Sequence, residues 1–162
     1  MGDDRLRCDK PMTHVAFYHL TKSTIEEALP KLLEHTLNAG KRALVKANSA
    51  DRVKCLSSAL WTEYNDSWLP HGIENNEHAK DQPIWLTFDD KNPNMATYIF
   101  LVDGVEIRDI TAFERCFDLF DGNDDDNLAA ARNRWRLLKD SGHELHYWQQ
   151  NERGLWEEKN KS

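Results

Sequence analysis

The sequence predicts a single α/β domain built on an open, mainly parallel sheet with helices on both faces. Two observations lead to this fold class. Short segments rich in β-branched and aromatic residues alternate with segments whose apolar residues recur at helical spacing. The length of 162 residues also suits one such domain with its own core. Strands that alternate with helices usually pair in parallel through right-handed crossovers, so this connectivity is expected here.

The first predicted unit is a strand, a helix and a second strand. A run of β-branched and aromatic residues opens the unit. Thr24 and Glu27 form a capping-box pattern at the start of a helix that continues to Gly40. Pro30 lies beyond the first turn and lacks a backbone donor, which predicts either a kink or a helix start later than Thr24. The two strands of this unit are expected at residues 15–20 and 42–46.

The rest of the chain continues the alternation, with one long exception. Ser49 can cap a second helix, and the acids from Asp124 can cap a third helix that stops at Gly142. Residues 62–82 are polar and irregular, so part of this connection is expected to be disordered. The segment 115–120 fits a strand better than the end of a helix. The remaining elements are predicted as helices at 50–61 and 126–140 and strands at 84–88, 97–102, 115–120 and 145–149.

One compact domain is predicted over residues 12–159, between a flexible extension at 1–11 and a tail at 160–162. The extension is mostly polar and charged, so the fold is expected not to need it. Three cysteines without close spacing give neither a disulfide framework nor a metal knuckle, which favours a reducing compartment. No secretory signal and no run of about 18 apolar residues is present. We therefore expect a soluble, cytoplasmic protein that does not contact membranes.

Charge and loop composition argue against two common functions. The chain has 21 Lys+Arg and 28 Asp+Glu, a net charge of -7, whereas a dedicated duplex-DNA binder needs a basic surface. The turn after the first strand, Thr21 to Thr24, contains no glycine that would let backbone amides approach a phosphate. No functional nucleotide-binding loop is therefore predicted.

No metal centre and no cofactor is predicted. The residues from Asp121 to Asp125 alternate like calcium ligands, but Asp126 stands where glycine is required and Arg132 where the closing glutamate is required. A solvated helix cap explains these acids better. His143 and His146 are three residues apart in a strand-like segment, which places them on opposite faces.

The most informative cluster is a run of cations with no acid among them in an acidic chain. On a helix, Arg132, Arg136 and Lys139 share one exposed face, because they stand at i, i+4 and i+7. Trp135 and Leu138 are expected to point toward the sheet. The cationic face is either an ordinary solvated surface or an anion-binding surface for a carboxylate-rich peptide or a single nucleic-acid strand. The cations of the run are Arg132, Arg134, Arg136 and Lys139.

A series of short motifs, in order over Val15 to Lys159, resembles one known family. The sequence resembles the chi subunits of bacterial DNA polymerase III, which are accessory proteins of the clamp loader. No single tetrapeptide is decisive, but the ordered series is specific. The motifs are Phe17-Tyr18-His19-Leu20, Ala28-Leu29-Pro30, Gly40-Lys41-Arg42-Ala43-Leu44-Val45, Leu60-Trp61, Leu69-Pro70-His71-Gly72, Gln82-Pro83-Ile84, Asn92-Pro93-Asn94, Phe120-Asp121-Gly122, Ala131-Arg132-Asn133-Arg134-Trp135 and Tyr147-Trp148-Gln149.

The resemblance implies a Rossmann-like sheet without catalytic activity. Members of this family bind the psi subunit and the acidic C-terminal tail of single-stranded DNA-binding protein. Carried over by position, the resemblance implicates Arg132 on the late helix and Trp68 in the loop before Pro70 in tail binding. Better-known members carry a lysine one helical turn before this arginine, and Leu128 stands there in this sequence. The resemblance maps psi binding onto no short motif.

The function expected from these observations is that of a non-enzymatic adaptor. It would link the clamp loader, through psi or another component, to single-stranded DNA-binding protein and contact DNA only indirectly. An acidic peptide ending in Pro-Phe would place its terminal carboxylate near Arg132 and its phenyl ring in an apolar pocket beside Trp68. Arg136 or Lys139 can replace the missing lysine. The alternatives are a nucleotide-dependent enzyme using the C-terminal edge of the sheet and a direct single-strand binder.

Overall fold

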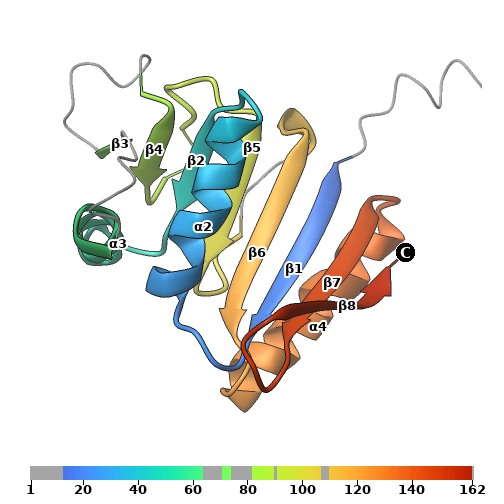
Figure 1. Cartoon of the computed structure of the whole chain (residues 1–162). Helices are drawn as coiled ribbons and strands as arrows, with labels where there is room; N and C mark the ends of the chain where they lie inside the picture. Colours follow the sequence, from blue (N-terminus) through green and yellow to red (C-terminus); the bar gives the residue numbers. More distant parts are fainter. Residues whose placement is uncertain (1–12, 64–70, 74–81, 90, 107–109, 162) are drawn as a thin grey trace, which may run out of the picture.

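The structure is a computed structural model that describes residues 13–63, 71–73, 82–89, 91–106 and 110–161. These residues form one eight-stranded sheet in the order β3-β4-β2-β5-β6-β1-β7-β8 (Figure 1). Neighbouring strands are parallel except β7 and β8, so the predicted open, mainly parallel α/β sheet is confirmed. The strands are β1 (His14–Leu20), β2 (Ala43–Lys46), β3 (His71–Ile73), β4 (Ile84–Thr87), β5 (Tyr98–Val102), β6 (Arg115–Asp121), β7 (Glu144–Gln150) and β8 (Trp156–Lys161).

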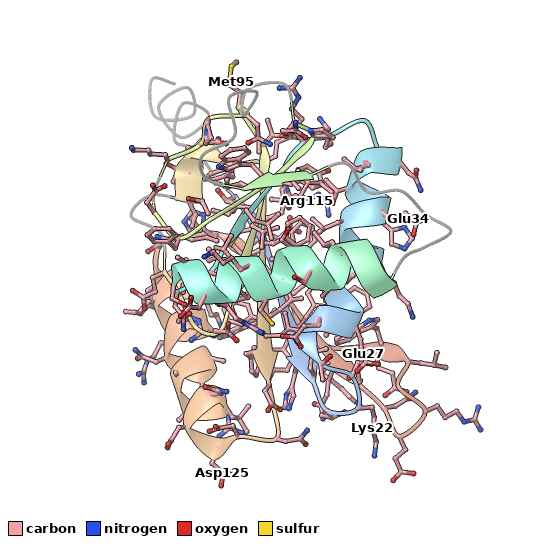
Figure 2. The ribbon with its side chains drawn as sticks, turned by 90° about the vertical axis from the view of Figure 1, so that its left-hand side faces the viewer. Lys22, Glu27, Glu34, Met95, Arg115 and Asp125 are labelled. Carbon is pink, nitrogen blue, oxygen red and sulfur yellow. The ribbon has the colours of Figure 1, made fainter. Side chains whose placement is uncertain are left out.

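Helices lie on both faces of this sheet. The helices α2 (Ile25–Asn38) and α3 (Ala50–Glu63) lie on one face and α4 (Asp125–Asp140) lies on the other (Figure 1). In the side view of Figure 2, α3 crosses the front of the molecule. A short 3-10 helix, η2 (Ile110–Ala112), precedes β6. None of the helices in the described ranges combines the length and the apolar run that a bilayer crossing requires.

Alternating side chains of the central strands divide the core into two layers. Phe100 and Phe117 belong to the layer under α2, together with Leu33 of that helix. Phe17 and Ile99 belong to the layer under α4. Because helices cover both faces, the central strands are almost continuously apolar, which is why the sequence pattern identified them.

The start of α2 is set by a complete capping box. The amide of Glu27 donates to Oγ1 of Thr24 over 3.2 Å, and Oε1 of Glu27 accepts from the amide of Thr24 over 3.1 Å. Pro30 lies inside the helix, which nevertheless begins at Ile25. The expected alternative of a later start is therefore wrong, because the two reciprocal bonds satisfy amides at that terminus.

Two strands were not predicted. The three-residue strand β3 lies in the stretch expected to be irregular. It pairs with β4 through backbone hydrogen bonds, which a pattern of side chains does not predict. Strand β8 pairs with β7, so the segment 145–149 does not complete the sheet as predicted. Most residues of β8 are charged, which is typical of a strand at the edge of a sheet. The strand therefore lacks the alternation of apolar and polar residues from which strands are predicted. Residues 1–12, 64–70 and 74–81 lie outside the described ranges.

Candidate functional site

A pocket of about 370 Å³ lies between α4 and the strands β1, β7 and β8. Four separate elements contribute to its wall, so the pocket exists only in the folded chain. It combines aromatic rings, one apolar side chain and cations, which is a suitable set for a ligand with both an apolar group and an anionic group. Among the lining residues are His19, Leu128, Arg132, Trp135, Tyr147 and Lys159.

The position of Arg132 follows from how α4 begins and which face it buries. The carboxylate of Asp124 accepts hydrogen bonds from the amides of Asp126 (2.9 Å) and Asn127 (3.2 Å), which confirms the expected helix cap. Ala131 is fully buried against the sheet. The next residue, Arg132, is exposed and lines the pocket.

The floor of the pocket is aromatic. The ring of Trp135 packs edge-to-face on Phe17, with centroids 5.4 Å apart, and on Tyr147, with centroids 5.7 Å apart. Trp135 is half-buried, so it faces inward as predicted and also presents part of its ring to the pocket. These ring contacts hold the floor in place before any ligand binds.

His19 supports this floor from β1. Its Nδ1 lies 2.8 Å from the hydroxyl oxygen of Tyr147 in a hydrogen bond, and only 8% of the residue is exposed. Burial lowers the pKa of His19, and the positive charge of Arg132 lowers it further. Burial also raises the pKa of Tyr147 to about 12. The pair is therefore neutral near pH 7, and Arg132 is the charged group beside it.

The four cations predicted as a cluster do not all line this pocket. Within the described residues, the guanidinium of Arg132 makes no hydrogen bond or ion pair. Arg136 and Lys139 are exposed as expected, but neither lines the pocket, and Nη2 of Arg136 donates to Oδ1 of Asn133 over 2.7 Å. Arg134 is buried on a different side of the helix. Only Arg132 of the predicted cationic face therefore reaches this site.

The other predicted site residues, Trp68 and Pro70, lie outside the described residues. Sequence reasoning missed His19, Tyr147 and Lys159, which line the pocket with Arg132. Alternation within the predicted strands gives the face on which a residue lies, but it does not give the order of the strands. The periodicity of the sequence therefore did not predict that His19, Tyr147 and Lys159 lie together with Arg132.

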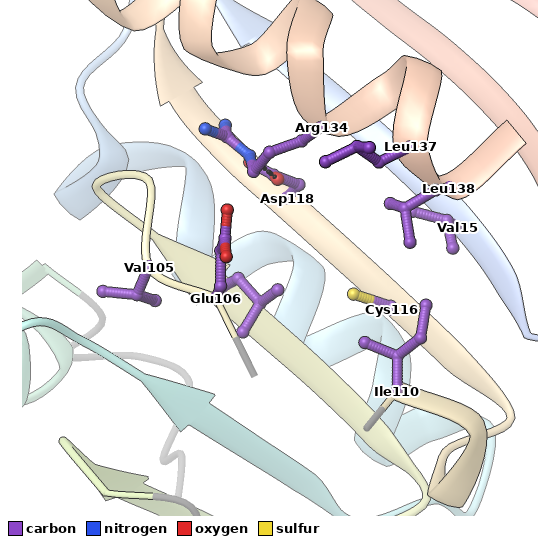
Figure 3. A pocket seen from close by; sticks show the side chains of 10 residues that line it. Val15, Val105, Glu106, Ile110, Cys116, Asp118, Arg134, Leu137 and Leu138 are labelled. Atoms are coloured by element: carbon purple, nitrogen blue, oxygen red, sulfur yellow. Dashed lines mark hydrogen bonds and ion pairs between the residues drawn. The ribbon is translucent and has the colours of Figure 1, made fainter. Parts of the chain in front are cut away.

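Arg134 lies in a second, smaller cavity of about 150 Å³ between α4 and strands β5 and β6 (Figure 3). Its Nε and Nη2 donate to the two carboxylate oxygens of Asp118 over 2.6 and 2.9 Å. Burial raises the pKa of the Asp118 carboxyl, and the guanidinium opposes this rise. Burial also raises the pKa of the neighbouring Cys116 thiol. The rest of this cavity is mainly apolar, so the pair joins helix to sheet within an apolar layer.

The turn between β1 and α2 has its backbone amides occupied by a side chain. Oε1 of Gln150 accepts hydrogen bonds from the amides of Thr21 (3.0 Å), Lys22 (2.9 Å) and Ser23 (3.0 Å). Amides at this place in open α/β sheets are the groups that bind phosphate. Here they are already satisfied within the chain, by a residue that is itself buried.

The nearby crevice at the C-terminal edge of the sheet is lined by ion-paired groups. Arg52 of α3 forms an ion pair with Glu26 of α2, and its Nε lies 2.6 Å from a carboxylate oxygen of Asp103 after β5. Asp121 lines the same crevice. Lys22 and Arg52 also line it, but Arg52 is already ion-paired with Glu26 and Asp103, so the crevice presents no concentrated positive charge to a nucleotide phosphate. Among the described residues, no three His, Cys, Asp or Glu side chains are arranged to hold a metal ion.

Comparison with known proteins gives one family. The family model described as "DNA polymerase III chi subunit, HolC" matches residues 12–146. A protein of Rickettsia prowazekii (strain Madrid E), described as a probable DNA polymerase III subunit chi, is 22% identical over 111 residues, which is 68% of this chain and 67% of that protein. The family match spans most of the described sheet. The chain therefore belongs to the DNA polymerase III chi subunit family.

Proposed function

We propose that this chain is a non-catalytic accessory subunit that links the clamp loader to single-stranded DNA-binding protein. In this proposal it binds the acidic C-terminal tail of that protein in the pocket beside α4, and it contacts DNA only through that partner. The observation that carries the proposal is the guanidinium of Arg132, which lines an aromatic pocket and makes no hydrogen bond or ion pair within the described residues. Such a cation is available for an anionic ligand.

The two parts of the pocket match the two groups of a C-terminal phenylalanine, its carboxylate and its phenyl ring. The planar guanidinium of Arg132 can hold a terminal carboxylate through two parallel hydrogen bonds. Trp135 and Leu128 offer the apolar contact for the phenyl ring, whose full burial contributes roughly 1.5 to 3 kcal/mol. Leu128, which replaces a lysine of the family pattern, thus adds apolar surface. Trp68 and Pro70 remain proposed contacts of the same ring.

Isothermal titration with an acidic peptide ending in Pro-Phe tests the proposal. We expect a dissociation constant on the order of micromolar, about -8 kcal/mol, because a disordered tail loses entropy when it binds. Removal of the last Phe or the substitution Arg132→Ala should weaken binding at least tenfold, and added salt should weaken it further. Arg136→Ala and Lys139→Ala are matched controls on the same helix and should bind normally. Equal affinity for all peptides and variants would refute the pocket assignment.

The face of the sheet opposite α4 is proposed as the contact for psi or another clamp-loader component. Neighbouring residues of one strand point to opposite faces, so Tyr18 lies on the α2 side while His19 lies on the α4 side. Tyr18 and Trp148 line a hollow of about 390 Å³ on that side. Among the described helices, α2 and α3 lie over the other half of this face (Figure 1). Two partners would thus use the two faces of β1 and β7 without competing.

A competition experiment separates the two faces. Reconstituted clamp-loader subunits, psi included, should bind the chain equally well with and without saturating tail peptide. Trp148→Ala should reduce their binding, whereas Leu155→Ala, which removes an exposed leucine elsewhere, should not. Displacement of the subunits by the peptide would place both partners on one face and contradict the proposal.

The absence of catalysis, of a cofactor and of membrane contact, and a cytoplasmic location, are parts of the same proposal. The amides of the β1–α2 turn, which Gln150 occupies, support the absence of a nucleotide cofactor. A nucleotide-dependent enzyme is the competing function. Saturable binding or turnover of a nucleoside triphosphate with magnesium would favour that enzyme over the adaptor.

A further inference from the structure

We propose that Lys159 of β8 is a second cation of the tail-binding pocket and that it binds acidic side chains of the peptide. This inference rests on the function proposed above. Lys159 lies on β8, beyond the residues 12–146 that the family model matches.

The pairing of β8 with β7 brings Lys159 to the pocket. Glu157 pairs with Gln149, which lines the pocket, and Lys159 lies two residues further along β8 on the same face. The ion pair between Glu157 and Lys159 agrees with this placement. Lys159 lines the same pocket as Tyr147 and Arg132. One cation from the helix and one from the edge strand thus flank the aromatic floor.

The two cations suit different carboxylates. Arg132 lines the pocket together with the hydrogen-bonded pair of His19 and Tyr147. The planar guanidinium of Arg132 suits one carboxylate in a fixed position, such as the C-terminal carboxylate of a peptide. The side chain of Lys159 is 50% exposed and carries a compact charge on a flexible stem. It can therefore follow acidic side chains whose positions vary along a tail.

The present partner of Lys159 can be replaced without moving the backbone. Nζ lies 3.1 Å from Oε1 of Glu157, whose side chain is similarly exposed. An exposed pair of this kind contributes little to stability, so a peptide carboxylate can replace Glu157 at small cost. Leu128 stands where better-known members of the family carry a lysine. Lys159 therefore supplies the second positive charge of this pocket.

A double-mutant cycle between protein and peptide tests this assignment. The acidic peptide ending in Pro-Phe and a version with every Asp replaced by Asn are titrated into the full chain, Lys159→Ala and Arg132→Ala. We expect Lys159→Ala to weaken binding of the acidic peptide about threefold at low salt and to leave binding of the Asn peptide unaffected, since a single exposed charge pair contributes little. Arg132→Ala should weaken both peptides, because both keep the terminal carboxylate.

The matched control is Glu157→Gln, which frees Lys159 of its ion pair and keeps its charge. This variant should bind the acidic peptide at least as well as the original chain. All variants should keep the unfolding temperature, because the substituted side chains are exposed. If Arg132→Ala weakens binding and Lys159→Ala does not, or if Lys159→Ala weakens both peptides equally, the role of Lys159 is refuted while the proposed function stands. If neither variant changes binding, the proposed function itself fails.

Discussion

Arg134 and Asp118 form a buried, two-point ion pair between α4 and β6. The side chains are only 8% and 3% exposed, and two hydrogen bonds of 2.6 and 2.9 Å join them. Arg134 stands in the middle of a run of cations, yet its charge is used inside the protein. The pair attaches α4, the helix that carries Arg132, to the sheet. The stability of the fold and the position of the pocket residue Arg132 therefore depend on the same helix.

Breaking this pair should destabilise the protein strongly. Arg134→Ala leaves the Asp118 carboxylate buried without its partner, and we expect the free energy of unfolding to fall by about 3 to 5 kcal/mol. Replacement of both residues by apolar ones, Arg134→Met with Asp118→Leu, should cost much less, because no charge is then left alone. Urea unfolding of both variants measures this difference. A loss below about 1 kcal/mol for Arg134→Ala would contradict the structural role.

A methyl group at position 122 should disturb the His19–Tyr147 pair. A Cβ built on Gly122 would lie 1.7 Å from Cδ2 of His19, so the imidazole must move. We expect Gly122→Ala to cost about 1 to 3 kcal/mol through overpacking. In a double-mutant cycle with His19→Ala the cost should shrink, because the clashing ring is gone. Additive costs of the two substitutions would argue against this contact.

His19 should make stability depend on pH. Its pKa is lowered in the folded protein, chiefly by burial, so the unfolded chain binds a proton more readily. Stability is therefore fully present above the unfolded pKa of about 6.5 and is lost as the pH falls from there through the folded pKa. Denaturant unfolding at pH 8 and pH 5 should show a smaller loss for His19→Leu than for the original chain. The other histidines contribute equally to both proteins, so equal losses would contradict the prediction.

Trp135 should affect both folding and binding. Its ring packs on Phe17 and Tyr147 and also lines the pocket. A fully buried tryptophan would make Trp135→Ala act only through unfolding, at a cost of about 3 to 5 kcal/mol. Because Trp135 is half-buried and lines the pocket, we expect a cost of about 3 kcal/mol together with weaker peptide binding by the folded protein. Trp135→Phe should keep most of the stability, and normal binding by folded Trp135→Ala would remove the ring from the site.

Thr13 should anchor the start of β1. This residue is fully buried, its hydroxyl lies 2.8 Å from the carbonyl oxygen of Ile110 and 3.0 Å from that of Phe113, and its amide donates to Nδ1 of His143 over 3.1 Å. Removal of residues 1–11 should change the unfolding temperature by less than about 3 °C. Thr13→Val should cost about 1 to 3 kcal/mol, because it removes the hydroxyl that donates to the Phe113 carbonyl, whereas the Ile110 carbonyl keeps the amide of Phe113. A large destabilisation on truncation would show that the extension packs on the domain.

The sequence was sufficient for the helix caps and the central strands, which depend on residues close together in the chain. The capping box of Thr24 and Glu27 and the cap at Asp124 are local hydrogen-bonding patterns, and both are present. The apolar runs identified the central strands because a sheet covered on both faces requires them. The ordered motifs also gave the family, which the comparison confirms. The exposure of Arg132, Arg136 and Lys139 followed from helical spacing alone.

Only the tertiary structure decided which of these groups meet. Parallel pairing places β1 beside β7, so His19 contacts Tyr147 although 128 residues separate them. The same arrangement buries Arg134 against Asp118, and β8 brings Lys159 to the pocket of Arg132. Periodicity determines the face of an element on which a side chain lies, whereas its partners depend on strand order, register and bulges. Strand order, register and bulges are set by the packing of the whole sheet, and a local sequence pattern carries no information about that packing.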